Sequence, residues 1–258
     1  MSTYESFKSK IYQLTGINLS SYKERQMKRR IESLMKRNDF NSFDEYYRSL
    51  EKNKERYEEF INYLTINVSE FYRNPAQWDV LEKEVFPSLL QKNKTLKVWS
   101  AACSTGEEPY SLVMLMSKFL PLNQVNIVAT DIDKMAIERA KTGLYTKKSL
   151  NNLPQKFVQD FFKAQGSNYQ ILESIKSRVT FKPMNLLEDA YPSSCDLIIC
   201  RNVMIYFTEE TKSEMYHKFH DALKPHGILF VGGTEQIILP NRYKLTPVKT
   251  FFYKKLAI

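Results

Sequence analysis

Residues 98–110, which read VWSAACSTGEEPY, constrain the fold of this chain more than any other stretch. A short apolar run passes through small residues to a single glycine, Gly106, and then into a second apolar run that predicts a helix. Pro109 suits the first helical turn, where its missing N–H has no helical partner, and Thr105 with Glu108 has the spacing of a capping box. Such a strand-loop-helix unit is typical of open α/β sheets, which bind ligands at the carboxyl ends of their strands.

The acidic residues of this loop indicate the kind of ligand it can hold. Glu107 and Glu108 would repel a diphosphate, and the loop has neither the glycine-rich cradle nor the lysine of phosphate-binding loops. Ribose hydroxyls or an ammonium group suit it better.

Polar residues also follow three other predicted strands. The strands cover residues 125–129, 179–181 and 197–200, and the polar residues after them are Asp131 and Asp133, Asn185, and Arg201, Asn202 and Tyr206. An acid at the end of the second strand is placed to accept both hydroxyls of a ribose, which fits Asp131, whereas Asp133 fits the N-cap of the next helix.

A row of such strand ends without a phosphate cradle fits a nucleoside that lacks phosphates, and S-adenosylmethionine is the common one. In this interpretation the row begins at Ala101. Asp131 binds the ribose, Asn185 the edge of the adenine, and Glu107 the ammonium group.

The first 74 residues predict a helical region. Apolar positions such as Phe7, Ile11 and Leu14 recur at helical spacing, and residues 43–64 read as one amphipathic helix. Residues 22–37 carry seven basic side chains against two acidic ones, which is either a solvated helix face or a surface that docks on an acidic partner. The net charge of +9 favours acidic partners in general.

Several function classes are disfavoured. The chain has no apolar run long enough to span a membrane and no secretory signal at its start, so we expect a cytoplasmic protein without membrane insertion. Its three cysteines read as buried small residues. His217 and His220 lack a third ligand nearby and read as ordinary helix residues, so no metal is predicted.

The remaining segments complete an α/β domain. The pattern weakens over residues 146–178, where a short helix and a hairpin around Gly166 look like an insertion into the sheet domain, and residues 243–255 predict a terminal hairpin that closes the sheet.

Taken together, the motifs VWSAACSTGEEPYS, ATDID, NLLE, CRNVMIYF and LKPHGILFVGGTE closely resemble, in order and spacing, the chemotaxis receptor methyltransferases of the CheR family. The stretch NVSEFYR is similar to that family's NLTxFFR signature, so the resemblance covers nearly the whole chain. It implies a helical N-terminal domain over residues 1–74 and a Rossmann-like, S-adenosylmethionine-dependent methyltransferase domain over residues 75–258. A small β-subdomain is inserted at residues 146–178.

The resemblance also implies the site residues. Those that match the family's cofactor contacts are Asn67, Ser69, Arg73, Ala101, Glu107, Asp131, Asn185, Leu186, Arg201 and Asn202. Arg73 and Tyr206 match the catalytic pair beside the methyl group and the substrate carboxylate. On spacing alone Arg73 reads as a surface cation stacked on an aromatic ring, and it is the resemblance that makes it a catalytic candidate.

The activity implied is methylation of glutamate side chains on the cytoplasmic helical region of membrane chemoreceptors, with S-adenosylhomocysteine as product. We expect a monomer, recruited to chemoreceptor arrays and binding no nucleic acid. The residues predicted to dock on the receptor are Arg25, Lys28, Arg29, Arg30 and Arg37.

The turn in FFKAQGSNYQI is shorter than that of family members that tether to a receptor's C-terminal peptide, so we expect no dependence on such a tether. Two alternatives remain. One is an RNA methyltransferase, although the Asn/Asp-Pro-Pro-aromatic loop of many base-modifying enzymes is replaced here by CRNVMIYF. The other is a non-catalytic, cofactor-binding sensor module.

Overall fold

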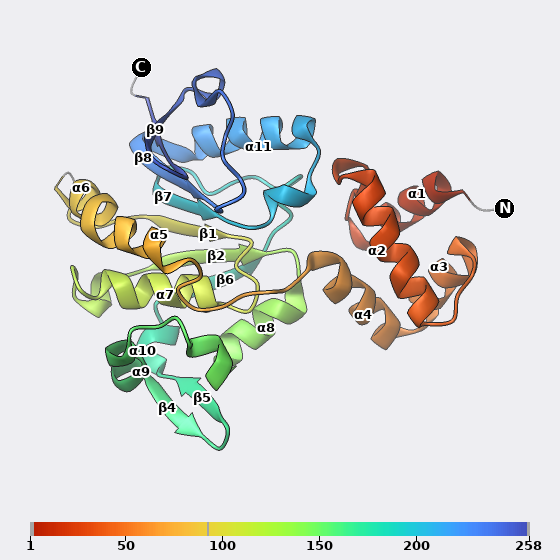
Figure 1. The fold of residues 1–258 in the computed structure, drawn as a ribbon, viewed down its shortest axis with the longest axis horizontal. Coiled ribbons are helices and arrows are strands. Elements are labelled where there is room, and N and C mark those ends of the chain that lie inside the picture. The colour runs from red at the N-terminus through yellow and green to blue at the C-terminus, as the bar shows by residue number, and fades with distance from the viewer. Residues whose placement is uncertain (1–2, 92, 257–258) are drawn as a thin grey trace. The chain divides into compact units, whose positions relative to one another are not determined.

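The computed structural model describes residues 3–91 and 93–256, and the chain forms two compact units. The helical unit comprises residues 1–67 and 203–214, and the sheet unit comprises residues 68–202 and 215–258 (Figure 1). Within the described ranges, no helix combines the length and the apolar character that crossing a membrane requires.

The helical unit is built on four helices: α1 (Tyr4–Thr15), α2 (Glu24–Arg37), α3 (Phe43–Lys52) and α4 (Lys54–Thr65), with a short 3-10 helix, η1 (Leu19–Ser21). Its core contains Phe7, Tyr46 and Phe60, which are fully buried. The prediction of one helix over residues 43–64 was wrong, because α3 ends at Lys52 and a separate helix, α4, begins after Asn53. There the Asn53 side chain accepts a hydrogen bond from the Arg56 N–H and caps a new helix.

A later segment of the chain also belongs to the helical unit. Residues 203–214 include the 3-10 helix η5 (Met204–Tyr206) and the start of α11 (Glu209–Ala222). The Lys23 N–H donates to the Tyr206 carbonyl at 2.8 Å, and the rings of Tyr22 and Phe207 pack edge to face. The Tyr206 backbone is therefore fixed to the segment that precedes α2.

The sheet unit has a seven-stranded sheet of order β6-β2-β1-β7-β8-β10-β9. Its first five strands are parallel and β10 and β9 are antiparallel, which confirms the predicted terminal hairpin. The strands are β1 (Val98–Ala101), β2 (Ile127–Asp131), β6 (Val179–Pro183), β7 (Cys195–Cys200), β8 (Leu223–Val231), β9 (Leu245–Lys249) and β10 (Phe252–Lys255). Every residue of β1 and β7 is buried, as expected for parallel strands covered on both faces.

Helices cover both faces of this sheet (Figure 1). They include α5 (Pro75–Val80), α6 (Phe86–Leu90), α7 (Glu107–Met116), α8 (Lys134–Thr142) and the end of α11. The helices α9 (Gln155–Phe161) and α10 (Glu173–Lys176) lie below α7, near the smaller sheet described below (Figure 1). Three short 3-10 helices, η3 (Leu122–Gln124), η4 (Lys147–Leu150) and η6 (Pro240–Tyr243), lie in the connections. Side chains alternate along β1, so Val98 joins the cluster around α7 while Trp99 packs against Phe219 of α11.

A π-helical segment, Leu81–Val85, connects α5 and α6. Pro87 has no N–H to donate to the preceding turn, and the Phe86 N–H bonds instead to the Leu81 carbonyl, five residues back.

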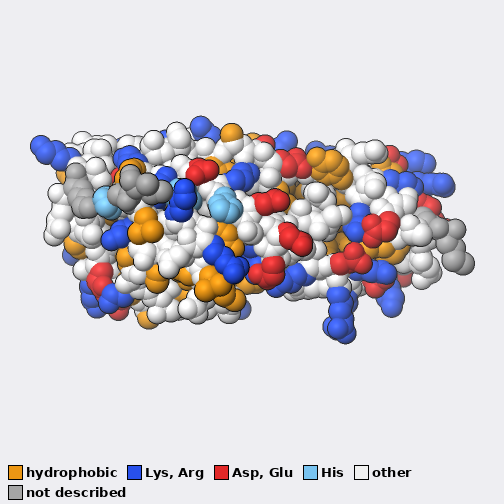
Figure 2. Space-filling model, turned by 90° about the horizontal axis from the view of Figure 1, so that it is seen from above, with side chains coloured by type: hydrophobic (Ala, Val, Ile, Leu, Met, Phe, Trp, Pro, Cys, Tyr) orange, Lys and Arg blue, Asp and Glu red, His pale blue; other side chains and the backbone are white. Residues whose placement is uncertain are grey.

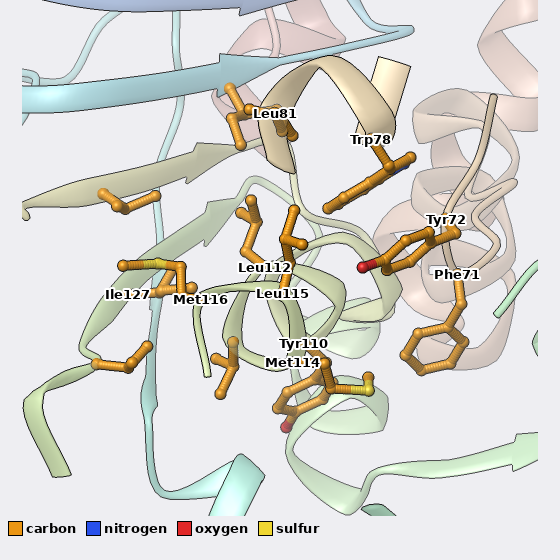
Figure 3. Close-up of a cluster of buried hydrophobic side chains, with 14 of the residues drawn as sticks. Phe71, Tyr72, Trp78, Leu81, Tyr110, Leu112, Met114, Leu115, Met116 and Ile127 are labelled. Atoms are coloured by element: carbon orange, nitrogen blue, oxygen red, sulfur yellow. The ribbon is translucent and has the colours of Figure 1, made fainter. Parts of the chain in front are cut away.

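The main apolar core lies between α5, α6, α7 and one face of the sheet. Figure 3 shows Tyr72 and Trp78 side by side at its edge, where their rings stack with centroids 4.6 Å apart. The chain just before α5 is thus anchored on the core that supports β1 and α7.

A separate three-stranded antiparallel sheet has the order β3-β5-β4, with β3 (Leu144–Thr146), β4 (Phe162–Gln165) and β5 (Asn168–Ile171). The strands β4 and β5 pair through a two-residue turn at Gly166, where φ is +61°, which confirms the predicted hairpin.

Candidate cofactor and active site

The parallel register brings the predicted strand ends together. Ala101 of β1 lies opposite Thr130 of β2 on one side and Cys200 of β7 on the other. Asp131, the last residue of β2, lies opposite Pro183 of β6, two residues before Asn185. The polar residues that follow these strands therefore leave the sheet along one edge.

The loop from β1 to α7 has an uncommon backbone. Ala102 and Ser104 adopt positive φ angles of 60° and 48°, and Gly106 has a φ of +93°. A Cβ at Gly106 would lie 2.8 Å from the Cβ of Ala140, so both the conformation and the close packing require glycine here. Sparsely populated backbone conformations of this kind cluster at ligand-binding sites.

The predicted capping box does not form. The N-cap of α7 is Gly106, and no side chain caps the helix. Thr105 donates to Glu107 at 2.7 Å, while Glu108 accepts from Ser100 at 2.8 Å. Glu108 is directed at buried polar partners, which outweighs its local capping preference.

Asp131 is 7 % exposed and fixes the loop. Its carboxylate accepts from the backbone N–H of Ser104 at 2.7 Å and from that of Asp133 at 2.9 Å. Burial is the main cause that raises the pKa of Asp131 to about 6, although these hydrogen bonds act in the opposite direction. Asp133 caps α8 by accepting from Met135 and Ala136, which confirms its predicted role.

Glu107 is the second buried acid of this edge and is 5 % exposed. It accepts from the hydroxyl of Thr105 and from that of Ser69, and burial raises its pKa. The hydrogen bond from Ser69 joins the 69–73 segment to the start of α7. The Tyr72 N–H strengthens this junction by donating to Ser111 of α7 at 3.3 Å.

These two acids fit the ligand predicted from the sequence. No Lys or Arg of the described residues forms an ion pair with Asp131 or Glu107. Buried carboxylates without a cation favour a ligand that brings positive charge and hydroxyl donors. S-adenosylmethionine has both, in its ammonium group, its sulfonium and its ribose.

Asn185 and Leu186 follow β6. The Asn185 side chain accepts from the Leu187 N–H at 3.0 Å, and its own N–H donates to Asp189 at 2.8 Å, so this turn is locally ordered. Leu186 is buried, and its carbonyl accepts from Tyr191 and Lys218.

Arg201 and Asn202 follow β7 and differ in their contacts. The Arg201 guanidinium is 2 % exposed and lies 3.4 Å from the Glu108 carboxylate. Its Nη2 donates to oxygens of Arg73, Asn74 and Gln77, and its buried Nε has no hydrogen-bond partner among the described residues. Burial lowers the pKa of Arg201 and raises that of Glu108, and each group partly offsets the shift of the other.

Glu235 is a residue of this edge that the sequence reasoning missed. It is 5 % exposed, and its carboxylate accepts from the N–H of Asn202 at 2.6 Å and from that of Gly232 at 2.8 Å. It thereby holds Asn202 in a positive φ of 61° and joins the ends of β7 and β8. The signal was present, since GGTE places an acid directly after a predicted strand.

The remaining predicted site residues belong to different units. Arg73 is in the sheet unit, half-buried, and donates to the Val68 carbonyl at 3.1 Å. Asn67 and Tyr206 are in the helical unit, where Asn67 donates to Thr65 at 3.1 Å. The two residues of the predicted catalytic pair therefore belong to different units, Arg73 to the sheet unit and Tyr206 to the helical unit.

The five predicted docking residues on α2 differ in how they are held. Arg30 donates to the Tyr63 carbonyl and stacks on its ring, Arg37 pairs with Glu59 at 2.7 Å, and Lys28 lies over the ring of Tyr4. Arg25 and Arg29 are exposed, and with Lys23 they line a depression of about 620 Å³ beside Tyr63. Figure 2 shows that Lys and Arg side chains project between Asp and Glu side chains on the face in view.

The cysteines and histidines take structural positions. All three cysteines are buried, as predicted, and burial raises their pKa. His217 packs on Tyr243, and His220 lies 2.9 Å from Asp221. Over residues 3–91 and 93–256, no group of three or more His, Cys, Asp and Glu side chains is arranged to hold a metal ion.

An α/β sheet with buried acids and no phosphate cradle at its strand ends has the character of a nucleoside-binding methyltransferase domain. Comparison with known families agrees. Residues 67–252 match the model described as CheR methyltransferase, SAM binding domain, and residues 2–65 match the CheR methyltransferase, all-alpha domain. The chain belongs to the CheR methyltransferase family and is an S-adenosylmethionine-dependent methyltransferase.

Curated relatives match along most of their length. A chemotaxis protein methyltransferase of Listeria innocua is 44 % identical over 241 residues, which cover 93 % of this chain and 92 % of the relative. Proteins of the same name from Borreliella burgdorferi and Escherichia coli K12 are 35 % and 34 % identical. They cover 91 % of this chain in each case, and 90 % and 85 % of their own lengths.

Proposed function

We propose that this protein transfers the methyl group of S-adenosylmethionine to glutamate side chains in the cytoplasmic helical region of chemoreceptors, forming methyl esters. The observation that carries the proposal is the hydrogen bond from Ser69 to Glu107. It attaches the segment that contains Arg73 to an acid of the cofactor edge. The match to chemotaxis protein methyltransferases over most of the chain supports the choice of substrate.

The cofactor residues divide by chemistry. Asp131 would bind the ribose hydroxyls, and Glu107 the ammonium group. Asn185, Leu186, Asn202 and Ala101 would complete the pocket around the adenosine, with Asn67 and Ser69 on the side of the N-terminal segment. When bound, the cofactor supplies an electrophilic methyl group on a sulfonium.

The chain then has to supply alignment, not a base. A glutamate with an ordinary pKa near 4.3 is already ionised at pH 7, so it can act as the nucleophile without losing a proton to the enzyme. The new bond forms between a glutamate oxygen and the methyl carbon as the carbon–sulfur bond breaks, and the electron pair remains on sulfur. Arg73 would hold the substrate carboxylate and Tyr206 would donate a hydrogen bond that orients it.

Docking would use α2 of the helical unit. Arg25 and Arg29 are spaced i, i+4 and share one helix face, and no ion pair is formed by either among the described residues. They are available to an acidic receptor helix, whereas Arg30 and Arg37 are held by Tyr63 and Glu59. We infer that Arg25 and Arg29 make the larger contribution and that such contacts recruit the enzyme, as a monomer, to receptor arrays in the cytoplasm.

The proposal is tested by incubating the protein with radiolabelled S-adenosylmethionine and either receptor cytoplasmic fragments or RNA. Label on the receptor that is released by mild base is the expected result, because a glutamyl methyl ester is hydrolysed under those conditions. Label on RNA alone would establish the RNA methyltransferase alternative, and cofactor binding with no transfer to either would establish a sensor module.

A further inference from the structure

The backbone of Arg73 is fixed by two donors from separate parts of the sheet unit. Its carbonyl accepts from Trp78 Nε1 at 3.0 Å and from Arg201 Nη2 at 2.8 Å. A second contact with Trp78 comes from the preceding residue, since the Tyr72 ring stacks on the indole with an interplanar angle of 17° (Figure 3). The Arg73 carbonyl, with two hydrogen bonds, is thus held more firmly than the half-exposed Arg73 side chain.

We call residues 73–77 the Arg73 turn. Arg201 Nη2 also lies 3.0 Å from Asn74 Oδ1 and 2.9 Å from Gln77 Oε1, so one nitrogen reaches three oxygens of this turn. The Gln77 N–H closes the turn by donating to the Asn74 carbonyl at 2.9 Å. Arg201 is separated from these partners by 124 to 128 residues in the sequence, so only the folded sheet brings them together.

The Arg73 turn needs such support because its backbone is strained. Asn74 within the turn has a φ of 60°, and Tyr72 directly before the turn has a φ of 52°, a region that residues other than glycine rarely adopt. Such conformations persist when the surrounding contacts determine them.

Arg201 is itself held rigidly. Its guanidinium lies over the ring of Phe230 at 4.8 Å, and its Nη1 faces the Glu108 carboxylate. Glu108 in turn accepts from Ser100 of β1. The chain of contacts runs from β1 through α7 and the end of β7 to the Arg73 turn, and each link is buried or half-buried.

We propose that Arg201 is a positioning residue for methyl transfer. With Glu108 behind it and Trp78 beside it, Arg201 fixes the Arg73 turn so that the Arg73 side chain enters the site from a single backbone conformation. This inference rests on the proposed function for the role of Arg73. It assigns to the Arg201 side chain a task different from the cofactor contact predicted from the sequence, because both Nη atoms are already engaged by the protein.

The planar fork of arginine is essential to this role. A lysine keeps the positive charge beside Glu108, but its single ammonium group cannot face Glu108 and the three oxygens of the turn at once. Arg201→Lys therefore tests geometry with the charge conserved. Arg139→Lys makes the same chemical change at an exposed position of α8 and serves as the matched control.

The first measurement needs no substrate. Hydrogen exchange in the protein without ligand should show the Gln77 amide exchanging about tenfold faster in Arg201→Lys, while the amides of β1 stay within about twofold of the wild type. Arg139→Lys should change neither. Unchanged exchange at Gln77 would overturn the positioning role, whatever the substrate of the enzyme proves to be.

The second measurement is a double-mutant cycle with Arg73→Ala. If Arg201 acts through Arg73, Arg201→Lys should lower kcat on receptor fragments about 30-fold in the wild-type background but less than about twofold in Arg73→Ala. The affinity for S-adenosylhomocysteine, measured by calorimetry, should be equally non-additive. Additive losses would mean that Arg201 contacts the cofactor or the substrate independently, and would overturn the proposal.

A second variant protects the test against misfolding. Trp78→Phe keeps an aromatic ring against Tyr72 but removes the indole donor to the Arg73 carbonyl. It should raise exchange at Gln77 by about threefold or more, and its effect on the affinity for S-adenosylhomocysteine should vanish in Arg73→Ala. If receptor fragments accept no methyl group from the wild type, the proposed function fails, whereas the exchange data and the binding cycle still decide the role of Arg201.

Discussion

The protein carries two charged regions that differ in almost every physical respect. At the edge of the sheet, Glu107, Asp131 and Arg201 are 5 to 7 % exposed, and each has hydrogen-bond partners from the protein. On α2 of the helical unit, Arg25 and Arg29 are exposed beside a broad depression. The first region holds charges in fixed places, and the second presents charges that are free to reorient.

Burial decides what each of the two regions can do. Buried charges interact strongly over short distances, and burial shifts their pKa values, so they can select one ligand in one orientation. Exposed charges are screened by salt and contribute modestly in each pair, so they suit the capture of a large acidic surface. Substitutions in one region should therefore change catalysis and cofactor binding, and substitutions in the other should change receptor capture.

Arg73→Ala gives the largest effect expected. If Arg73 aligns the substrate carboxylate, its removal should lower kcat about 100-fold to 1000-fold, the range found when one preorganised hydrogen-bond donor is lost from an active site. Methyl transfer to receptor fragments measures it, and Arg178→Ala, at a half-buried arginine before β6, is the control. Near-normal transfer by Arg73→Ala would remove Arg73 from the mechanism.

Asp131→Asn should weaken cofactor binding with little change of volume. The amide cannot accept from both ribose hydroxyls and the two backbone N–H groups as a carboxylate does, so we expect S-adenosylhomocysteine affinity to fall about 100-fold, or about 3 kcal/mol. Calorimetry provides the measurement. Asp79→Asn changes an exposed acid of α5 and should leave the affinity unaltered. A loss of less than about threefold in Asp131→Asn would show that the ribose is bound elsewhere.

Charge reversal on α2 tests the exposed region. Arg25→Glu with Arg29→Glu should raise KM for receptor fragments about tenfold at low salt, with kcat at saturation preserved, and high salt should shrink the difference. The charge-matched control is Lys52→Glu with Lys94→Glu, two exposed lysines outside α2. Equal effects of the two double variants, or a KM indifferent to salt, would contradict docking through this face.

The affinity for the cofactor should depend on pH through the buried Asp131. Asp131 has a pKa of about 6, and a ribose needs its ionised form, so S-adenosylhomocysteine affinity should fall about tenfold between pH 7.5 and pH 5. The stability of the unbound protein should change with pH in the opposite direction. Because the folded pKa lies above the ordinary value, the contribution of Asp131 to stability is greatest below about pH 4 and is lost as the pH rises through about 6. Asp131→Asn should abolish its part of both trends, and a pH profile identical to the wild type would refute the assignment.

The smallest effect concerns the tether. Receptor fragments that lack their C-terminal peptide should be methylated within about twofold of the full-length rate, because the turn between β4 and β5 has only two residues and the short turn in the sequence predicts no tether. A drop of tenfold or more would assign a docking role to the small sheet.

Local patterns in the sequence predicted the secondary structure where one physical preference dominated. The apolar runs of β1 and β7, the hairpin at Gly166 and the cap at Asp133 all form as expected. Errors arose where preferences competed. Residues 43–64 have a continuous apolar pattern that conceals the cap at Asn53, and Glu108 has a capping spacing but turns toward Ser100 and Arg201.

Residue types at fixed spacing were enough to predict which strands are followed by polar residues, the chemical character of the ligand and the family of the protein. Which buried groups contact one another became visible only in the three-dimensional fold. Glu235 holds Asn202, and Arg201 holds the Arg73 turn across more than a hundred residues of chain. Such contacts depend on how strands from distant parts of the chain align in one sheet, and no local pattern specifies that alignment.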